Sequence, residues 1–341
     1  MIDLIILIIM YIIKIKIYMN RYICLYRFDD IKHEYKKINI KKLNNYKKND
    51  LIFINIASFR DPVCHKTIKS LIYNSDNWRN LRICVCQQNF INDIDCLYNL
   101  NKKYHSIMKI INLNYLKARG PTKARYLIQQ KYSGEEYYLQ IDSHTFFFKH
   151  WDTILKKTLN KLPDKSCITQ YLPEINNIKL RGQLNVVEIN IIDSFTRINS
   201  DYTEYSNKIF NSNSWSASFS FSNGDICVDA PIDPYTPNLF FGEEMDITLR
   251  LYTRDWKFYS PNYIIACTNF DRSYRKTFWE NDNYNKYLSS LSKLRVHHRF
   301  GTLPKHVILP NELLIDSDKY ALGNNKTLND YENLIKFKII Y

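Results

Sequence analysis

The chain has 341 residues, of which 45% are hydrophobic and 24% are charged, so the composition supports a buried core and excludes global disorder. The net charge of +14 raises the question of nucleic-acid binding, but the lysines are scattered and no aromatic-basic motif of a nucleic-acid module is present. We therefore interpret the excess charge as a solvated surface and expect no nucleic-acid partner. The length fits one large α/β domain, or a catalytic core with an appended piece.

The N-terminus carries a continuous apolar run from Leu4 to Ile13, after which two lysines interrupt it. A membrane-spanning helix needs about 20 apolar residues, so this run is too short unless residues up to Met19 extend it. One interpretation is a membrane anchor, and because the basic residues follow the run, the rest of the chain would then be cytosolic. The other is a segment that packs on the domain or precedes the true start at Met19. We expect a cytoplasmic protein, with membrane attachment through this segment as the alternative.

Composition divides the chain into four parts. Residues 1–19 form the apolar segment, and residues 20–50 are basic and polar, which is typical of a linker. Residues 51–300 carry the periodic apolar segments and motifs of a catalytic domain, and residues 301–341 form a C-terminal extension. The eight cysteines include no Cys-x-x-Cys pair, which argues against a structural zinc site and favours buried thiols in a reducing compartment.

Apolar runs of strand length alternate with helical patterns through the first half of the chain. In chain order, they predict strand Leu51–Ala57, a helix after Asp61-Pro62 with Asp61 as its N-cap, strand Leu81–Cys86, a helix around Ile94–Tyr104, strand Ile107–Leu113, a helix from Gly120 to about Tyr132, and strand Tyr137–Ile141.

The second half is less regular. It predicts strands at Leu184–Ile191, Ser216–Phe221 and Tyr263–Cys267, and a helix at Glu243–Tyr252. Alternating strands and helices indicate an α/β fold with a mixed, mostly parallel sheet, in which ligands gather beyond the carboxyl ends of the strands. Ser58, Arg60 and Asp142 follow such strand ends.

The triplet Asp142-Ser143-His144 directly follows a buried strand. A carboxylate oxygen and an imidazole nitrogen placed two residues apart can turn toward one point, and together they suit a divalent ion such as Mn²⁺. Such an ion could bridge the two phosphates of a nucleotide diphosphate. On its own the pattern is weak, because most Asp-x-His triplets are surface accidents, and its place after a hydrophobic strand strengthens it.

Three further segments combine polar residues with backbone signals. Gly242 precedes Glu243 and Glu244, which either present a carboxylate to substrate hydroxyls or simply begin a helix. Ser58 and Arg60 end the first strand and could hold a nucleotide, or they could be surface residues beside a helix cap. The segment from Gly120 to Arg125 begins a helix with basic residues nearby and suits either an anion or solvent.

Taken together, these segments resemble the hydroxyproline-type polypeptide N-acetylglucosaminyltransferases. The resemblance covers roughly residues 50–300 and is carried by Ile56–Pro62, Gly120-Pro121 with Ala124-Arg125, Gly134–His144 with Trp151-Asp152, Pro231–Pro234, Leu239–Glu244, and Phe258–Pro261 with Arg272 and Arg275. A related pattern, Asp-x-His followed by a Gly-Glu-Asn segment, occurs in the mucin-type polypeptide GalNAc-transferases.

The resemblance implies a glycosyltransferase A-type (GT-A) fold, a UDP-GlcNAc donor, a divalent cofactor (Mn²⁺ or Mg²⁺) and retention of anomeric configuration. The acceptor would be a protein hydroxyproline, Ser or Thr, or a glycan. Asp142 and His144 would bind the metal, and Glu243 and Glu244 would be the catalytic candidates. The donor would be bound by Ser58, Arg60, Gly120, Arg125, Asp142 and Gly242.

One departure from the family opens an alternative. The family usually carries a His, which fits a third metal ligand, at a place where this chain has Thr268 or Asn269. His297 and His298 are imidazoles further along the chain. The departure favours a catalytically decayed glycosyltransferase-fold binding protein, whereas the intact Asp-Ser-His and Gly-Glu-Glu segments favour an enzyme.

Overall fold

The computed structural model describes residues 49–176, 181–190, 195–204, 209–261, 263–281 and 284–339, all within the unit Asn45–Tyr341. The apolar segment of residues 1–19 and the expected linker up to residue 48 lie outside the described residues. Within those ranges, no helix combines the length and the apolar character that crossing a bilayer requires.

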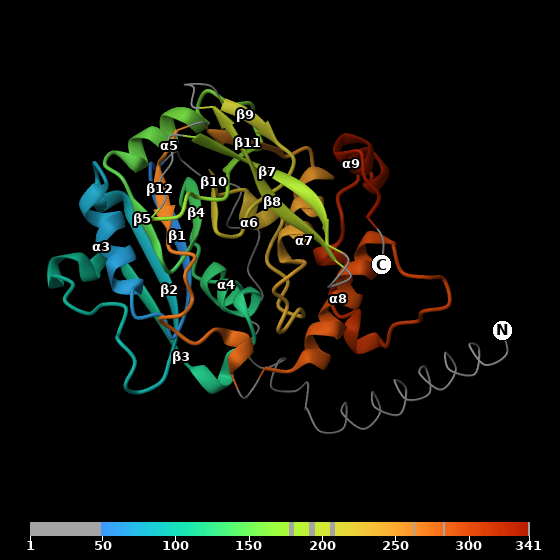
Figure 1. Cartoon of the computed structure of the whole chain (residues 1–341), viewed down its shortest axis with the longest axis horizontal. Helices are drawn as coiled ribbons and strands as arrows, with labels where there is room; N and C mark the ends of the chain where they lie inside the picture. Colours follow the sequence, from blue (N-terminus) through green and yellow to red (C-terminus); the bar gives the residue numbers. More distant parts are fainter. Residues whose placement is uncertain are drawn as a thin grey trace. The chain divides into compact units, whose positions relative to one another are not determined.

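An eight-stranded sheet with the order β3-β2-β1-β4-β10-β6-β11-β9 forms the centre of the fold (Figure 1). Its strands are β1 Ile52–Phe59, β2 Leu81–Asn89, β3 Met108–Asn114, β4 Tyr137–Asp142, β6 Ser166–Thr169, β9 Ile209–Ser212, β10 Phe219–Asn223 and β11 Lys257–Pro261. β1 runs parallel to both β2 and β4, whereas β10 is antiparallel to β4 and β6. The sheet is therefore mixed, and the strands of the first half are parallel, as the sequence predicted.

Two small antiparallel sheets accompany the central one. β5 (Thr145–Phe147) pairs with β12 (Ala266–Thr268), and β7 (Arg181–Asn190) pairs with β8 (Phe195–Glu204). The first of these pairs brings the segment after β4 beside a segment more than a hundred residues further along the chain. This pairing places the loop that follows β12 next to the end of β4.

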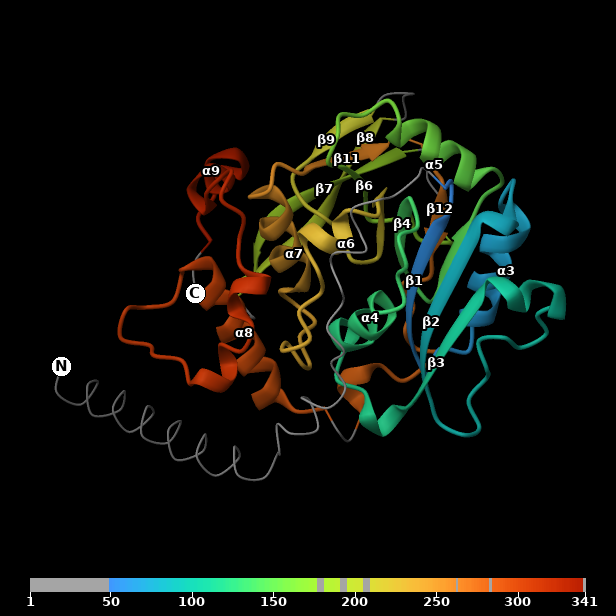
Figure 2. The ribbon, with the colours of Figure 1, turned by 180° about the vertical axis from the view of Figure 1, so that it is seen from behind.

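Helices cover both faces of the central sheet (Figures 1 and 2). α3 (Cys64–Asn74) and α5 (Trp151–Leu159) lie on one face, and α4 (Pro121–Gln129), α6 (Ile226–Asp229) and α7 (Glu243–Tyr252) lie on the other. The alternating side chains of β1 serve both cores, because Ile54 packs on the α3 side and Phe53 on the α4 side. Burial on both faces explains why this strand is a continuous apolar run in the sequence.

The C-terminal helices α8 (Lys286–Phe300) and α9 (Leu328–Ile335) pack against α7 through a third cluster that includes Leu249, Val296 and Tyr331. A buried ion pair reinforces the contact between α8 and α7, because Arg299 pairs with Asp246. The cluster fixes α7 from the side opposite the sheet, and α7 is the helix that begins at Glu243.

Two local predictions were wrong. Ile94–Tyr104 forms turns followed by a 3₁₀ helix, Lys102–Ile107, in place of an α-helix. The side chain of Asp95 accepts a hydrogen bond from the backbone N of Leu97, and such local bonds compete with helical ones. Asp61 is also not the N-cap of α3, which is Val63 without a side-chain cap. The seven cysteines in the described ranges are free and buried, as expected.

Candidate functional site

The Asp142-Ser143-His144 segment is the tight turn that leads from β4 into β5. Asp142 is the last residue of β4, so it lies at the carboxyl end of a strand that is parallel to β1. The carbonyl of Ser143 accepts a hydrogen bond from Thr67 Oγ1 at 2.8 Å, and the carbonyl of His144 accepts one from the backbone N of Asn269 at 3.1 Å. The turn is thus held from both sides.

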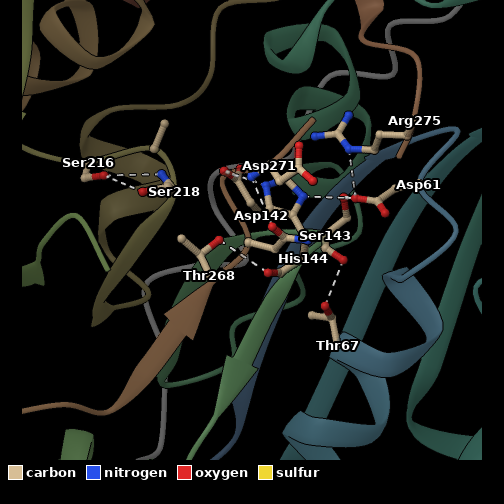
Figure 3. A network of polar contacts seen from close by, with 12 residues as sticks. Asp61, Thr67, Asp142, Ser143, His144, Ser216, Ser218, Thr268, Asp271 and Arg275 are labelled. Atoms are coloured by element: carbon tan, nitrogen blue, oxygen red, sulfur yellow. Dashed lines mark hydrogen bonds and ion pairs between the residues drawn. The ribbon is translucent and has the colours of Figure 1, made fainter. Parts of the chain in front are cut away.

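Asp61 lies against this turn, with none of its side chain exposed. Its Oδ2 accepts a hydrogen bond from Ser143 Oγ at 2.6 Å and lies 2.9 Å from His144 Nδ1 and 3.5 Å from Arg275 Nε (Figure 3). The Tyr274 hydroxyl donates to Oδ1 at 3.4 Å. Burial alone would raise the pKa of Asp61, but hydrogen bonds and charges from His144 and Arg275 outweigh it and lower that pKa.

The two predicted metal ligands face each other. His144 Nε2 and Asp142 Oδ2 are 3.9 Å apart, an interval that one ion can span with bonds of roughly 2.1 Å. Within the described ranges, no group of three or more His, Cys, Asp or Glu side chains is arranged to hold a metal. Thr268 Oγ1 donates to the carbonyl of His144 at 3.3 Å. His297 and His298 lie on α8 and line neither of the two clefts described below.

Arg125 joins the strand end to the start of α7. Its guanidinium is buried and donates to Asp142 Oδ1 at 3.0 Å, to Glu243 Oε2 at 2.5 Å and to the carbonyl of Ala217 at 3.2 Å. Buried charges are stable only when they are paired, and this arginine pairs with two carboxylates at once. Arg125 therefore fixes the position of Asp142, and both of its terminal nitrogens are already engaged by the protein.

The two glutamates of α7 are held separately. Gly242 has a φ of 111° and caps the helix in a conformation that favours glycine. Glu244 Oε1 accepts the backbone N of Ala217 at 2.9 Å, and Oε2 accepts the Tyr171 hydroxyl at 2.5 Å. Burial raises the pKa of Glu244 to about 7, although these hydrogen bonds oppose the shift. Burial also raises the pKa of Glu243, against the lowering effect of its arginine partner.

Two adjoining clefts meet at Asp142 and His144. The strand-end cleft opens at the ends of β1, β2 and β4 and is lined by Ala57, Phe59, Gln88, Gly120, Pro121, Arg125, Asp142, Ser143, His144, Phe240, Arg272, Arg275, Thr277, Phe278 and Trp279. The helix-start cleft opens at the beginning of α7 and is lined by Arg125, Asp142, His144, Tyr171, Ala217, Ser218, Phe240, Phe241, Gly242, Glu243, Glu244, Met245, Phe270 and Arg272.

The remaining predicted donor-binding residues differ in position. Gly120 lines the strand-end cleft with a φ of 85°, which favours glycine. Ser58 is fully buried in β1 and lines neither cleft. Arg60 lines a neighbouring cavity, where it forms a two-point pair with Asp93 at 2.8 and 3.1 Å and stacks 4.8 Å above the ring of Tyr115. Their contact with a donor stays a prediction.

The loop of residues 269–277 places two arginines over the clefts. Arg275 faces Asp61, whereas Arg272 lies against the adjoining rings of Trp279 and Phe240, at 5.0 and 5.9 Å from their ring centroids. Within the described part of the chain, no oxygen accepts a hydrogen bond from the Arg272 guanidinium. Burial lowers the pKa of Arg272, as does Arg275 nearby, while Asp142 opposes the shift. The guanidinium that remains unpaired lines both clefts.

The sequence matches the family described as Glycosyltransferase (GlcNAc) over residues 51–110 and 100–340. The chain belongs to this family. No curated protein sequence matches it. Among solved structures, GalNAc-T7 with UDP, GalNAc and Mn²⁺ is similar in fold, with a TM-score of 0.54 and 10% identity over 84% of this chain and 57% of that one. This chain therefore spans little more than half of the length of that protein.

A structure of Staphylococcus aureus TarS 1-349 with UDP-GlcNAc also matches, with a TM-score of 0.46 and 12% identity over 73% of each chain. Family membership and the GalNAc-T7 likeness confirm the GT-A fold and the glycosyltransferase family that the sequence predicted. They do not assign roles to individual residues of this chain.

Sequence reasoning missed several residues of this glycosyltransferase site. Asp61 was interpreted as a helix cap, and Tyr171 was not singled out. Arg272 and Arg275 were noted only as part of a resemblance, without a role. The local signal for Asp61 was that it follows the end of β1, which is also the reason why Arg60 was singled out. No sequence signal marks Tyr171, because its contact with Glu244 joins residues 73 positions apart.

Proposed function

We propose that this glycosyltransferase transfers GlcNAc from a UDP-sugar donor to a hydroxyl group, on a protein hydroxyproline, Ser or Thr or on a glycan, with a divalent metal and with retention of configuration. One observation carries the proposal: Arg125 ties the Asp142-Ser143-His144 turn to the Gly242-Glu243-Glu244 helix start, so both motifs line one pair of clefts. The fold is shared with a protein that was solved with UDP, GalNAc and Mn²⁺, which supports a nucleotide-sugar donor.

The residues present fit a divalent ion. Asp142 gives Oδ1 to Arg125, which leaves Oδ2 facing His144 Nε2, and one oxygen with one nitrogen is a donor set that Mn²⁺ accepts. Asp142 and His144 would hold the ion. When bound, the metal would stabilise the negative charge of the leaving diphosphate.

The residues of the chain itself bind and orient the substrates. Arg272 offers a guanidinium that lies against two adjoining rings without a hydrogen-bonded oxygen partner, and a diphosphate supplies the oxygens that it lacks. Glu244, with a pKa of about 7, lines the helix-start cleft and can hold or release a proton there near neutral pH. We assign Glu244 to the orientation of the acceptor hydroxyl or the sugar. Glu243, paired with Arg125, then serves mainly to hold the site together.

A donor screen tests the proposal. Purified full-length chain is incubated with Mn²⁺ and each of several UDP-sugars, and released UDP is measured. We expect turnover to be fastest with UDP-GlcNAc and to be lost in Asp142→Asn, which keeps the shape of the side chain. The matched control Asp164→Asn changes an exposed residue outside both clefts and should leave turnover intact. Equal turnover in the wild type and Asp142→Asn would refute the metal assignment.

A second candidate is a decayed glycosyltransferase-fold binding protein. The observation that favours it is that the described residues offer Asp142 and His144 but no third His, Cys, Asp or Glu ligand. Thermal shift with UDP, with and without Mn²⁺, separates the candidates when it is combined with the donor screen. Stabilisation by UDP together with no turnover on any donor would support the binding protein, whereas turnover would exclude it.

A further inference from the structure

The carboxylate of Asp61 brings together three segments that are far apart in sequence. Asp61 follows β1, His144 belongs to the β4–β5 turn 83 residues later, and Arg275 comes from the loop after β12. Figure 3 shows the imidazole and the guanidinium both directed at this one carboxylate. Because its side chain is fully buried, Asp61 cannot contact a substrate itself, and any functional role must pass through its neighbours.

The chemistry of the contact determines which ring nitrogen of His144 carries a hydrogen. An ionised carboxylate can only accept hydrogen bonds, so the nitrogen 2.9 Å from Asp61 Oδ2, Nδ1, must be the donor. The arginine 3.5 Å away and the Ser143 hydroxyl at 2.6 Å favour the ionised form of Asp61. In a neutral imidazole, Nε2 is then the nitrogen with the free electron pair.

The other ring nitrogen faces the clefts. His144 lines both of them, and its Nε2 lies 3.9 Å from Asp142 Oδ2, a distance too long for a hydrogen bond. An Asp–His contact alone does not make a site: His150 Nδ1 lies 2.6 Å from Asp76, but that pair is exposed and lines neither cleft. What distinguishes His144 is that its second nitrogen shares a cleft with a carboxylate oxygen.

Asp61 also has an ordinary structural contact, because its Oδ1 accepts the backbone N of Val63 at 3.0 Å just before α3. That turn needs only one oxygen. It does not require the second oxygen to be buried against an imidazole, a hydroxyl and a guanidinium. The contacts of Oδ2 therefore indicate that Asp61 has a role besides stabilising the turn before α3.

We propose that Asp61 is a positioning residue, which fixes the tautomer and the orientation of His144 so that Nε2 presents its electron pair to the divalent ion of the donor site. The inference rests on the proposed function for the identity of the metal ion. The assignment of the His144 tautomer does not depend on it. A carboxylate behind a metal-binding histidine typically improves metal affinity by 10- to 100-fold.

The substitution Asp61→Asn tests this with little change of shape. Because Oδ1 accepts from Val63, the amide nitrogen should take the place of Oδ2 and donate to Nδ1, which moves the imidazole hydrogen to Nε2. We would measure ¹⁵N chemical shifts of the imidazoles in metal-free, full-length protein labelled at histidine, with His144→Gln to assign the signal. The matched control is Asp76→Asn, at the exposed pair with His150.

We expect the wild type and Asp76→Asn to show His144 with hydrogen on Nδ1 only, and Asp61→Asn to lose that state. Mn²⁺ titration followed by electron paramagnetic resonance should show about 10- to 100-fold weaker binding in Asp61→Asn and no change in the control. A hydrogen on Nε2 in the wild type, or an unchanged tautomer in Asp61→Asn, would overturn the proposal. If Asp61→Asn fails to fold, the wild-type spectrum alone still decides it. Wild type that binds no Mn²⁺ but shows the expected tautomers would uphold the positioning role and overturn the metal in the proposed function.

Discussion

The ionisation of Glu244 should oppose folding. The carboxyl group is partly buried, and this burial raises its pKa from 4.5 to about 7 in spite of hydrogen bonds from Tyr171 and Ala217. A group whose pKa is higher in the folded than in the unfolded state contributes stability below the unfolded pKa and loses it as the pH rises through the folded pKa. The difference between the unfolded and the folded pKa corresponds to a loss of about 3 kcal/mol in the free energy of unfolding, at roughly 1.4 kcal/mol per pH unit.

Glu244→Gln removes this ionisation and keeps the hydrogen bonds, because the amide oxygen can accept from Ala217 and the amide nitrogen can donate to the Tyr171 oxygen. The variant should match the wild type near pH 5 and exceed its free energy of unfolding by about 3 kcal/mol at pH 8. Urea unfolding at pH 5, 6, 7 and 8, with the slope checked for constancy, measures the difference. The variant should also lose transferase activity, since stability and function compete at such sites.

Glu280→Gln is a control of opposite sign. Glu280 is exposed, and hydrogen bonds from Thr277 lower its pKa, so its ionisation favours folding. That stability is complete above about pH 4.5 and is lost only as the pH falls through the lowered pKa, so the substitution should cost the same amount at every pH from 5 to 8. A stability difference between wild type and Glu244→Gln that stays flat from pH 5 to pH 8 would refute the reasoning about burial.

Three further predictions concern the same site. Arg125→Met should lower the free energy of unfolding by about 3–5 kcal/mol in urea titrations, because Glu243 is left as a buried unpaired charge, and the double variant with Glu243→Leu should recover most of the loss. Arg272→Ala should weaken UDP binding by about 10- to 100-fold in calorimetry and leave the binding of uridine, which lacks the diphosphate, unchanged. The control Arg79→Ala removes an arginine stacked on a tryptophan outside the clefts and should leave the binding of both unchanged. Gly120→Ala should cost about 1–3 kcal/mol in the same urea titrations, because its φ is 85° and a methyl group would lie 3.2 Å from a neighbouring backbone carbon.

The sequence predicted well the elements whose signals lie within their own residues. β1, β2 and β4 are apolar runs buried on both faces, so composition and length were enough to find them. The helix predicted at Glu243–Tyr252 has the same bounds in the structure, because Gly242 in a left-handed conformation and a run of acidic residues mark its start. In each case the signal lies within about ten residues of the element itself.

The parts that the sequence did not predict depend on contacts over long distances. The expected helix near Ile94 failed because Asp95 and Asn101 bond to nearby backbone N–H groups, a competition that an apolar count does not register. Asp61 has the sequence context of a helix cap, and only the β4–β5 turn reveals that its second oxygen faces His144. The sequence could therefore name Asp142 and His144 as candidates, but it could not find the groups that orient them.

The carboxylates of Asp61 and Asp142, which both lie beside His144, have different roles because they differ in solvent exposure. Asp61 is fully buried, whereas 30% of the Asp142 side chain is exposed. Asp142 gives one oxygen to Arg125 and keeps the other at the cleft, so it can still reach a ligand, while Asp61 can only act on the imidazole. A variant at Asp61 should therefore weaken metal binding while both ligands, Asp142 and His144, remain in the chain, whereas a variant at Asp142 should remove a ligand outright. If both substitutions abolished Mn²⁺ binding to the same extent, this division between ligand and support would be wrong.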